Sequence, residues 1–265
     1  MNILTQELKM EWKSLVVWCI SLISVLLFFM LMYPSISAQM ADFQKVFNSF
    51  PIEFQRALGV ENLNIGNVLG YYTFTMTYIL LAGAVQAMNL GVSVLSSEVR
   101  DKTGDFLFVK PVSRRRIISM KMLAVFIQIV ITNAAFFIAS WLILTMISST
   151  SFDTNLFILL TGTLFFIQIF FASFGFFISV FLRRIKTVLP ISMGVVFLFY
   201  IIFLLNETLK DVKLGYISPF DYFALSAISK NMSYDSVYLV LWTFLVFLFV
   251  YLTFHVFGKK DLPSI

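Results

Sequence analysis

Six long apolar runs, separated by short polar segments, dominate the pattern of the chain. Each run is close to the roughly 20 residues that a helix needs to cross about 30 Å of hydrocarbon. Lys121 is the only charged residue inside them, as expected where charge must be kept out of lipid. The pattern predicts an all-α integral membrane protein, a single transmembrane domain over residues 1–265. Its predicted spans are 15–33, 68–96, 117–147, 155–182, 188–206 and 236–257.

Two polar segments have the spacing of amphipathic helices. Residues 1–14 place Leu4, Leu8 and Trp12 on one helical side, which predicts an N-terminal interfacial helix on the inner membrane face. Residues 36–54 repeat an apolar side chain every three or four positions, which predicts an outer amphipathic helix. That stripe consists of Ile36, Met40, Phe43, Phe47, Phe50 and Phe54.

A third polar segment, residues 207–235, precedes the last predicted span. Pro219 marks a turn within it. The apolar side chains around this turn are expected to dip into the outer membrane interface, where aromatic residues are common. They are Phe220, Tyr222, Phe223 and Leu225.

Composition and charge place the segments relative to the membrane. The chain is 60% hydrophobic and 12% charged, which leaves too little polar surface for a sizeable soluble domain. Fourteen of its 19 Lys and Arg lie in segments on the same side as the N-terminus. The positive-inside rule therefore predicts cytoplasmic termini and a cytoplasmic 97–116 loop. Orientation accounts for the net charge of +5, so no nucleic-acid partner is inferred.

Motifs of catalysis and metal binding are missing from the sequence. It contains no G-x-x-x-x-G-K-[ST] phosphate loop, no H-E-x-x-H and no G-x-S-x-G, and its single histidine is His255. The predicted spans contain no carboxylate to couple ion flow to transport. We therefore expect no catalytic residue, no metal and no cofactor bound by this chain, and we do not expect it to be an enzyme by itself.

Neutral amides are the notable polar groups within the spans. In lipid such amides need partners, so they face another helix or a wet cavity. Hydrogen bonding between helices is the simpler interpretation, and contact with a transported substrate is the other. The candidates for a translocation path are Gln86, Asn89, Gln128, Asn133 and Gln168.

The 97–116 loop carries the most specific motif in the chain. In order, it contains Glu98, Thr103-Gly104, Phe106-Leu107 and the run Lys110 to Arg114, "KPVSR", with Lys121 at the start of the next span. This order resembles the first cytoplasmic loop of type-2 ABC exporter permeases. The resemblance extends to the N-terminal segment, to "FPIEFQRALGV" in the first outer loop and to "SPFDYF" before the last span.

The resemblance implies that this loop forms a cytoplasmic coupling helix, which docks into a separate ABC ATPase. The residues implied in ATPase coupling are Glu98, Thr103, Gly104, Phe106, Leu107, Phe108, Pro111, Arg114 and Arg115. Two ATPase copies would bind ATP and Mg, and a second permease copy, identical or not, would complete the transporter. Membrane lipid would be a further partner of the basic side chains.

The expected function is therefore export of an amphipathic or lipophilic substrate, a peptide or a drug, across a bacterial cytoplasmic membrane. The alternative is a membrane protein without transport activity, such as a structural partner or an immunity or assembly protein. A solvated basic loop that merely obeys the positive-inside rule would suit that alternative. The need for Phe106 and Phe108 in ATPase binding separates the two.

Overall fold

The computed structural model of the chain describes residues 3–40, 46, 49–51, 66–100, 114–148, 151–181, 187–209 and 212–259. Within these ranges the fold is helical and contains no strand. The long helices are α1 (Ile3–Ala38), α4 (Val68–Arg100), α6 (Arg114–Ile147), α7 (Thr154–Phe181), α8 (Leu189–Leu209) and α12 (Ser236–Lys259). Three short helices lie between α8 and α12: α9 (Val212–Gly215), α10 (Pro219–Tyr222) and α11 (Leu225–Asn231).

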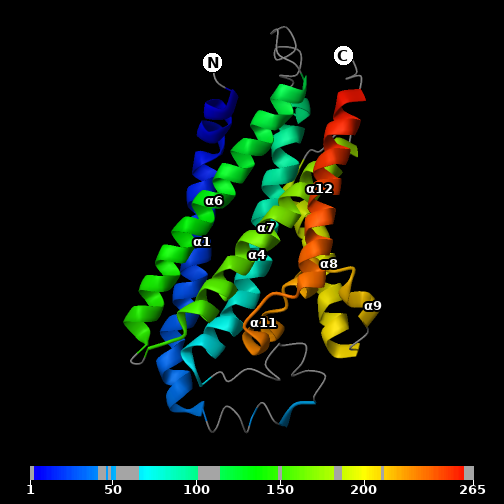
Figure 1. Cartoon of the computed structure of the whole chain (residues 1–265). Coiled ribbons are helices and arrows are strands. Elements are labelled where there is room, and N and C mark those ends of the chain that lie inside the picture. Colours follow the sequence, from blue (N-terminus) through cyan, green and yellow to red (C-terminus); the bar gives the residue numbers. More distant parts are fainter. Residues whose placement is uncertain are drawn as a thin grey trace.

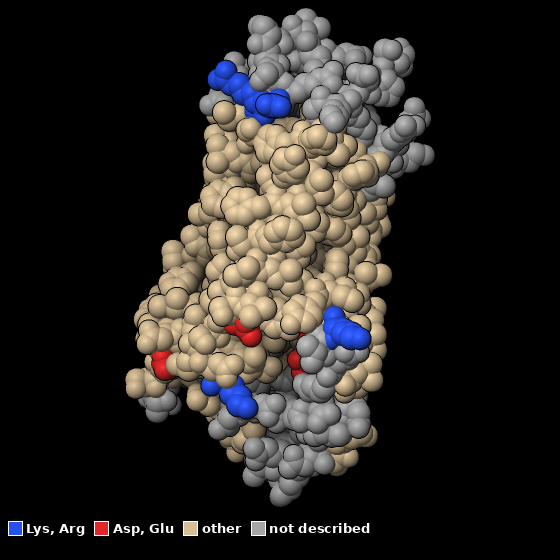
Figure 2. Space-filling model, turned by 45° about the vertical axis from the view of Figure 1, so that its right-hand side comes forward, with Lys and Arg blue, Asp and Glu red and all other residues tan. Residues whose placement is uncertain are grey.

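The six long helices are all long and apolar enough to cross a membrane. They form one bundle, with both chain ends at one end of it and α9 and α11 at the other (Figure 1). On the face shown in Figure 2, the described charged side chains lie toward the two ends, with an uncharged band between them. The prediction of an all-α membrane protein with six spanning helices is confirmed.

Helices α4 and α7 form the centre of the bundle, and glycines let their backbones touch. A side chain at Gly91 of α4 would overlap the carbonyl oxygen of Ala172 in α7. A Cβ at Gly175 of α7 would lie 2.9 Å from the carbonyl oxygen of Met88. Small residues commonly permit such close approach where lipid supplies no hydrophobic drive for helix association.

The N-terminal segment differs from its prediction. We expected a separate interfacial helix over residues 1–14, but residues 3–14 form the first turns of α1, which continues without a break to Ala38. No Gly or Pro lies near residue 14 to end a helix there. In addition, Glu7 turns toward the bundle, where it is held by a partner on α6.

The outer segments are only partly described. Of the stripe predicted over residues 36–54, Phe43, Phe47 and Phe54 lie outside the described residues, and Ile36 belongs to the last turn of α1. Residues 212–231 form α9, α10 and α11 with short turns between them. The apolar residues expected at the outer interface are instead buried within the protein, against α7, α8 and α12. These are Phe220, Tyr222, Phe223 and Leu225.

Candidate functional site

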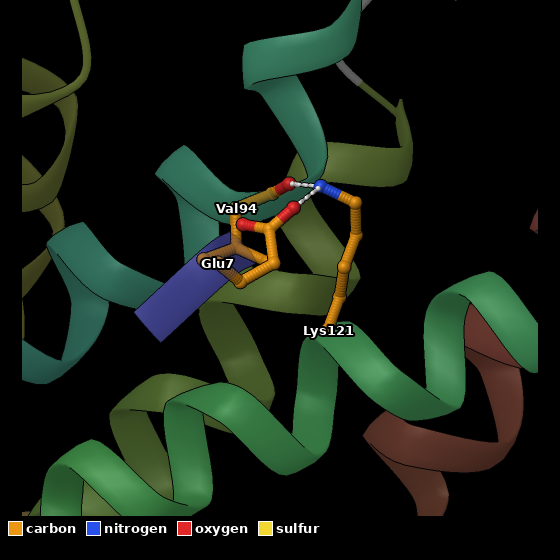
Figure 3. A network of polar contacts seen from close by, with 3 residues as sticks. All are labelled: Glu7, Val94 and Lys121. Atoms are coloured by element: carbon orange, nitrogen blue, oxygen red, sulfur yellow. Dashed lines mark hydrogen bonds and ion pairs between the residues drawn. The ribbon is translucent and has the colours of Figure 1, made fainter. Parts of the chain in front are cut away.

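Lys121 joins three helices near the end of the bundle that carries both chain termini. Its Nζ donates to Oε1 of Glu7 on α1 at 2.7 Å and to the backbone carbonyl of Val94 on α4 at 2.8 Å (Figure 3). Lys121 is 1% exposed. Because removal of one partner leaves a buried charge uncompensated, breaking such a pair typically costs about 3–5 kcal/mol.

The contacts between α1 and α6 show how far along the helix axes this ion pair lies relative to the predicted spans. Glu7 is opposite Lys121, and Cys19 approaches Thr132, with Sγ and Oγ1 3.8 Å apart. The two helices therefore run parallel in a nearly constant register. At 1.5 Å per residue, Glu7 lies about 12 Å before Leu15, the first residue of the predicted first span. Lys121 is thus level with residues that precede that span, although the apolar run 117–147 includes it.

A hydrogen-bonded amide network joins the helices at a second level. Gln86 Nε2 donates to Thr132 Oγ1 at 3.1 Å, and Gln168 Nε2 donates to Gln86 Oε1 at 3.1 Å. Asn133 Nδ2 completes the network by donating to Gln168 Oε1 at 2.6 Å. Three predicted path residues, Gln86, Asn133 and Gln168, are thereby brought together from α4, α6 and α7. Their arrangement suits helix–helix bonding, and their contact with a substrate stays a prediction.

The other two candidate path residues do not join this network. Gln128 lies one turn before Thr132 on α6, with its whole side chain buried. Neither Gln128 Nε2 nor Oε1 has a hydrogen-bond partner among the described residues. Asn89 is half-buried on α4, and no described hydrogen bond involves its side chain.

The predicted coupling residues lie at the end of α4, at the start of α6 and in the segment of chain between them. Glu98 belongs to the last turns of α4, Arg114 begins α6, and the side chain of Arg115 is exposed. The others lie outside the described residues: Thr103, Gly104, Phe106, Leu107, Phe108 and Pro111. The two helices that carry the 97–116 loop are tied together by the bond from Lys121 to Val94.

At the opposite end of the bundle, "SPFDYF" is fixed to α8. Asn206 Nδ2 of α8 donates to Asp221 Oδ1 at 2.8 Å. Ser218 Oγ donates to the carbonyl of Phe199 and accepts from the backbone N–H of Phe220, which caps α10. A short helix with few bonds of its own is thus held by one side chain and one backbone carbonyl of a spanning helix.

Tyr222 fixes the same segment from within. Its hydroxyl donates to the carbonyl of Tyr216 at 2.6 Å. Burial, together with the nearby Asp221 carboxyl and Tyr238, raises the pKa of Tyr222 to about 12. The hydroxyl is therefore a donor throughout the physiological pH range.

A cavity lies beside this segment, between α4, α8, α10 and α11. Aromatic rings make up much of its wall, and Thr73, Thr77 and Glu207 add polar atoms. The aromatic residues are Tyr200, Phe203, Phe220 and Phe223. With a volume of about 40 Å³, the cavity has room for a few water molecules and not for a drug-sized molecule.

A family model described as ABC-2 family transporter protein matches residues 1–262. The chain belongs to that family. The comparison with curated proteins gives no significant match. The ABC-2 family accounts for the six spanning helices, and it identifies the chain as a membrane-spanning permease of a transporter. Permeases of this family generally pair with an ABC ATPase and are not themselves enzymes.

Sequence reasoning did not find several groups that organise the ABC-2 permease. Lys121 was noticed as the one charge within a predicted span, but its partner Glu7 was assigned to a separate helix. A buried lysine demands an acceptor, and this signal pointed to an acidic partner without choosing among the carboxylates on the same side. The bond from Asn206 to Asp221 joins residues of two elements whose packing the sequence pattern does not specify.

Proposed function

We propose that this permease is the membrane subunit of an ATP-driven exporter and is powered by two copies of a cytoplasmic ABC ATPase. One observation carries the proposal: α4 and α6, which flank the 97–116 loop, are tied by Lys121 near their junction with that loop. A force applied to the loop would therefore act on two spanning helices together. The family match supports this assignment, since ABC-2 permeases generally work with an ATPase.

In this proposal the apolar residues Phe106 to Val109 form the coupling helix and enter a cleft in the ATPase. Arg114 and Arg115 hold the rim of the contact, against carboxylates or anionic lipid. ATP and Mg bind the ATPase, and its closure moves α4 and α6. A second permease copy, identical or different, supplies the other half of the transporter.

We propose an amphipathic or lipophilic substrate, a peptide or a drug. The chain's 32 Phe and its apolar spans support this choice, because a path lined by such residues suits a largely apolar molecule. The amides that remain candidates for the path are Gln86, Asn89, Gln128, Asn133 and Gln168. In this proposal, transport is directed outward across a bacterial cytoplasmic membrane. Both termini lie in the cytoplasm, as the distribution of Lys and Arg indicates.

The test is purification of the tagged permease in mild detergent, with mass spectrometry of the proteins that co-elute. We expect an ABC ATPase at equal stoichiometry. Phe106→Asp and Phe108→Asp should abolish this association, because a carboxylate cannot enter an apolar cleft without a partner. Phe106→Leu is the matched control and should retain it. Absence of an ATPase even with trapped nucleotide would favour the alternative of a membrane protein without transport activity.

A further inference from the structure

We infer that Lys121 is a positioning residue for coupling: it makes the cytoplasmic ends of α1, α4 and α6 move as one rigid body. Displacement of the 97–116 loop would then reach α1, although the loop directly continues only α4 and α6. This inference rests on the proposed function, since it specifies how the ATPase stroke is distributed within the permease.

The contacts of Lys121 supply the first joint of this body. The ammonium group lies between the Glu7 carboxylate of α1 and the Val94 carbonyl of α4, and it belongs to α6 (Figure 3). The side chains of Lys121 and Glu7 are 2% and 13% exposed, so water competes little for either charge. Separation of α1 from α6 at this level would leave both charges without their partner in a poorly solvated place.

A second joint connects the same three helices further along the bundle. Thr132 of α6 accepts from Gln86 of α4, and Cys19 of α1 approaches the same hydroxyl. Eleven residues of α6 separate Lys121 from Thr132, which is about 17 Å along a helix. Helices joined at one level can pivot about it, whereas helices joined at two distant levels cannot. The three helices therefore transmit a tilt as a unit.

The first joint lies close to the 97–116 loop, so a movement of that loop by the ATPase would reach it directly. Val94 lies six residues before the end of α4, and Lys121 lies seven residues after the start of α6. The joint is thus within two turns of the 97–116 loop on both sides. Helix α12 takes part in neither joint. It is bound chiefly to α7, through contacts such as the Trp242 indole N–H to the Phe166 carbonyl, so a movement of the unit relative to α12 falls at the contact of α12 with α7. We expect the unit of α1, α4 and α6 to move relative to α12.

The experiment measures distances between spin labels in the reconstituted permease–ATPase complex, with and without trapped nucleotide. Labels at Lys9→Cys and Arg116→Cys report on α1 relative to α6, in a Cys19→Ser background whose hydroxyl can keep the contact with Thr132. Labels at Arg116→Cys and His255→Cys report on α6 relative to α12. All three positions are exposed and lie near the end of the bundle that carries both chain termini. Lys121→Met and Glu7→Gln open the joint, and Lys13→Gln, which removes an exposed charge from α1, is the control.

We expect nucleotide to change the α6–α12 distance and to leave the α1–α6 distance constant in the unmodified joint. In Lys121→Met and Glu7→Gln, nucleotide should change or broaden the α1–α6 distance, while ATPase association is retained. Substrate transported per ATP should fall roughly two- to thirtyfold. The charge exchange Glu7→Lys with Lys121→Glu should restore a constant α1–α6 distance through the ion pair alone, because a carboxylate at position 121 cannot donate to the Val94 carbonyl. It also covers the case in which Lys121→Met fails to fold.

Two results would overturn the inference. If nucleotide changes the α1–α6 distance in the unmodified joint as much as in Lys121→Met, the three helices are no rigid unit, and the proposed function stands. If neither pair of labels responds to nucleotide in a complex that binds it, the permease does not follow the ATPase. In that case the proposed function fails, and the inference fails with it.

Discussion

Gln128 is a buried amide that the helix bundle leaves without a hydrogen bond among the described residues. Leaving a buried polar group unsatisfied costs about 1–3 kcal/mol. Gln128→Leu should therefore stabilise the permease by a similar amount, because it replaces the amide with an apolar group of nearly equal size. Thermal unfolding in detergent measures this change.

The matched control is Gln86→Leu, which removes an equally buried amide that has two partners, Thr132 and Gln168. It should lower the unfolding temperature, with each lost bond contributing about 0.6 kcal/mol. A Gln128→Leu variant that is less stable than the parent would mean that the amide has a partner such as a bound water. If Gln128 lines the substrate path, the variant would be stable and slow in transport.

Individual polar residues were recognisable in the sequence, whereas their partners were not. Gln86, Asn133 and Gln168 stood out because amides are conspicuous in apolar runs. Thr132 did not, since a threonine can satisfy its own hydroxyl by donating to the carbonyl one turn back, as Thr132 does to Gln128. Pairing depends on the rotation of each helix about its axis, and the sequence pattern defines that rotation poorly when nearly every face is apolar.

At the scale of helices, the close contact of α4 with α7 gives a testable prediction for stability. Gly91→Ala should force the two backbones apart, because its Cβ would overlap the Ala172 carbonyl oxygen. Overpacking of this kind typically costs about 1–3 kcal/mol. Gly194→Ala is the control, since a Cβ there meets no atom within 4 Å. The yield of folded protein and its unfolding temperature should fall for Gly91→Ala alone, and equal losses in both variants would contradict close packing at Gly91.

The short helix α10 should respond to alkaline pH through Tyr222. Its pKa is raised in the folded protein from the ordinary value of 10.0 to about 12, so folding favours the neutral phenol. This contribution to stability is complete below pH 10 and is lost as the pH rises toward 12. Thermal unfolding over this range should show a smaller decline for Tyr222→Phe than for the parent. Equal declines would mean that Tyr222 ionises freely.

The existence of the long helices followed from the sequence, and their limits followed less well. Predicted spans mark where apolar residues run, but a helix continues until a residue or contact ends it. Nothing ends α1 near residue 14, so it extends through the charged segment to Ile3. The segment 207–235 was predicted only as a turn with interfacial side chains. Its burial depends on contacts with α7, α8 and α12, which local sequence does not encode.

For the whole molecule, the orientation in the membrane is open to direct measurement. Lys9 and Ser151 are exposed and belong to opposite ends of the bundle. In a Cys19→Ser background, a membrane-impermeant thiol reagent added to intact cells should label Ser151→Cys and spare Lys9→Cys. Both should be labelled after the membrane is permeabilised. The reverse pattern would place the 97–116 loop outside and exclude a cytoplasmic ATPase as its partner.

The class of protein and the number of spanning helices were readable at this scale, because excluding charge from lipid leaves a strong signal in the sequence. The arrangement of the helices was not, since α1 packs on α6 and α4 packs on α7, and neither pair is adjacent in the chain. Which helices pack on each other is determined by small residues and buried polar groups at a few positions.

The ion pair that joins α1 to α6 also sets a sequence of events during synthesis. Glu7 and Lys121 are 114 residues apart in the chain, and both acceptors of the lysine precede it. When α6 is synthesised, the Glu7 carboxylate and the Val94 carbonyl, which accept from Lys121, have already been synthesised. Until then α1 carries an acid without this partner. The contact of α1 with α6 at this level therefore cannot form until the third long helix has been inserted.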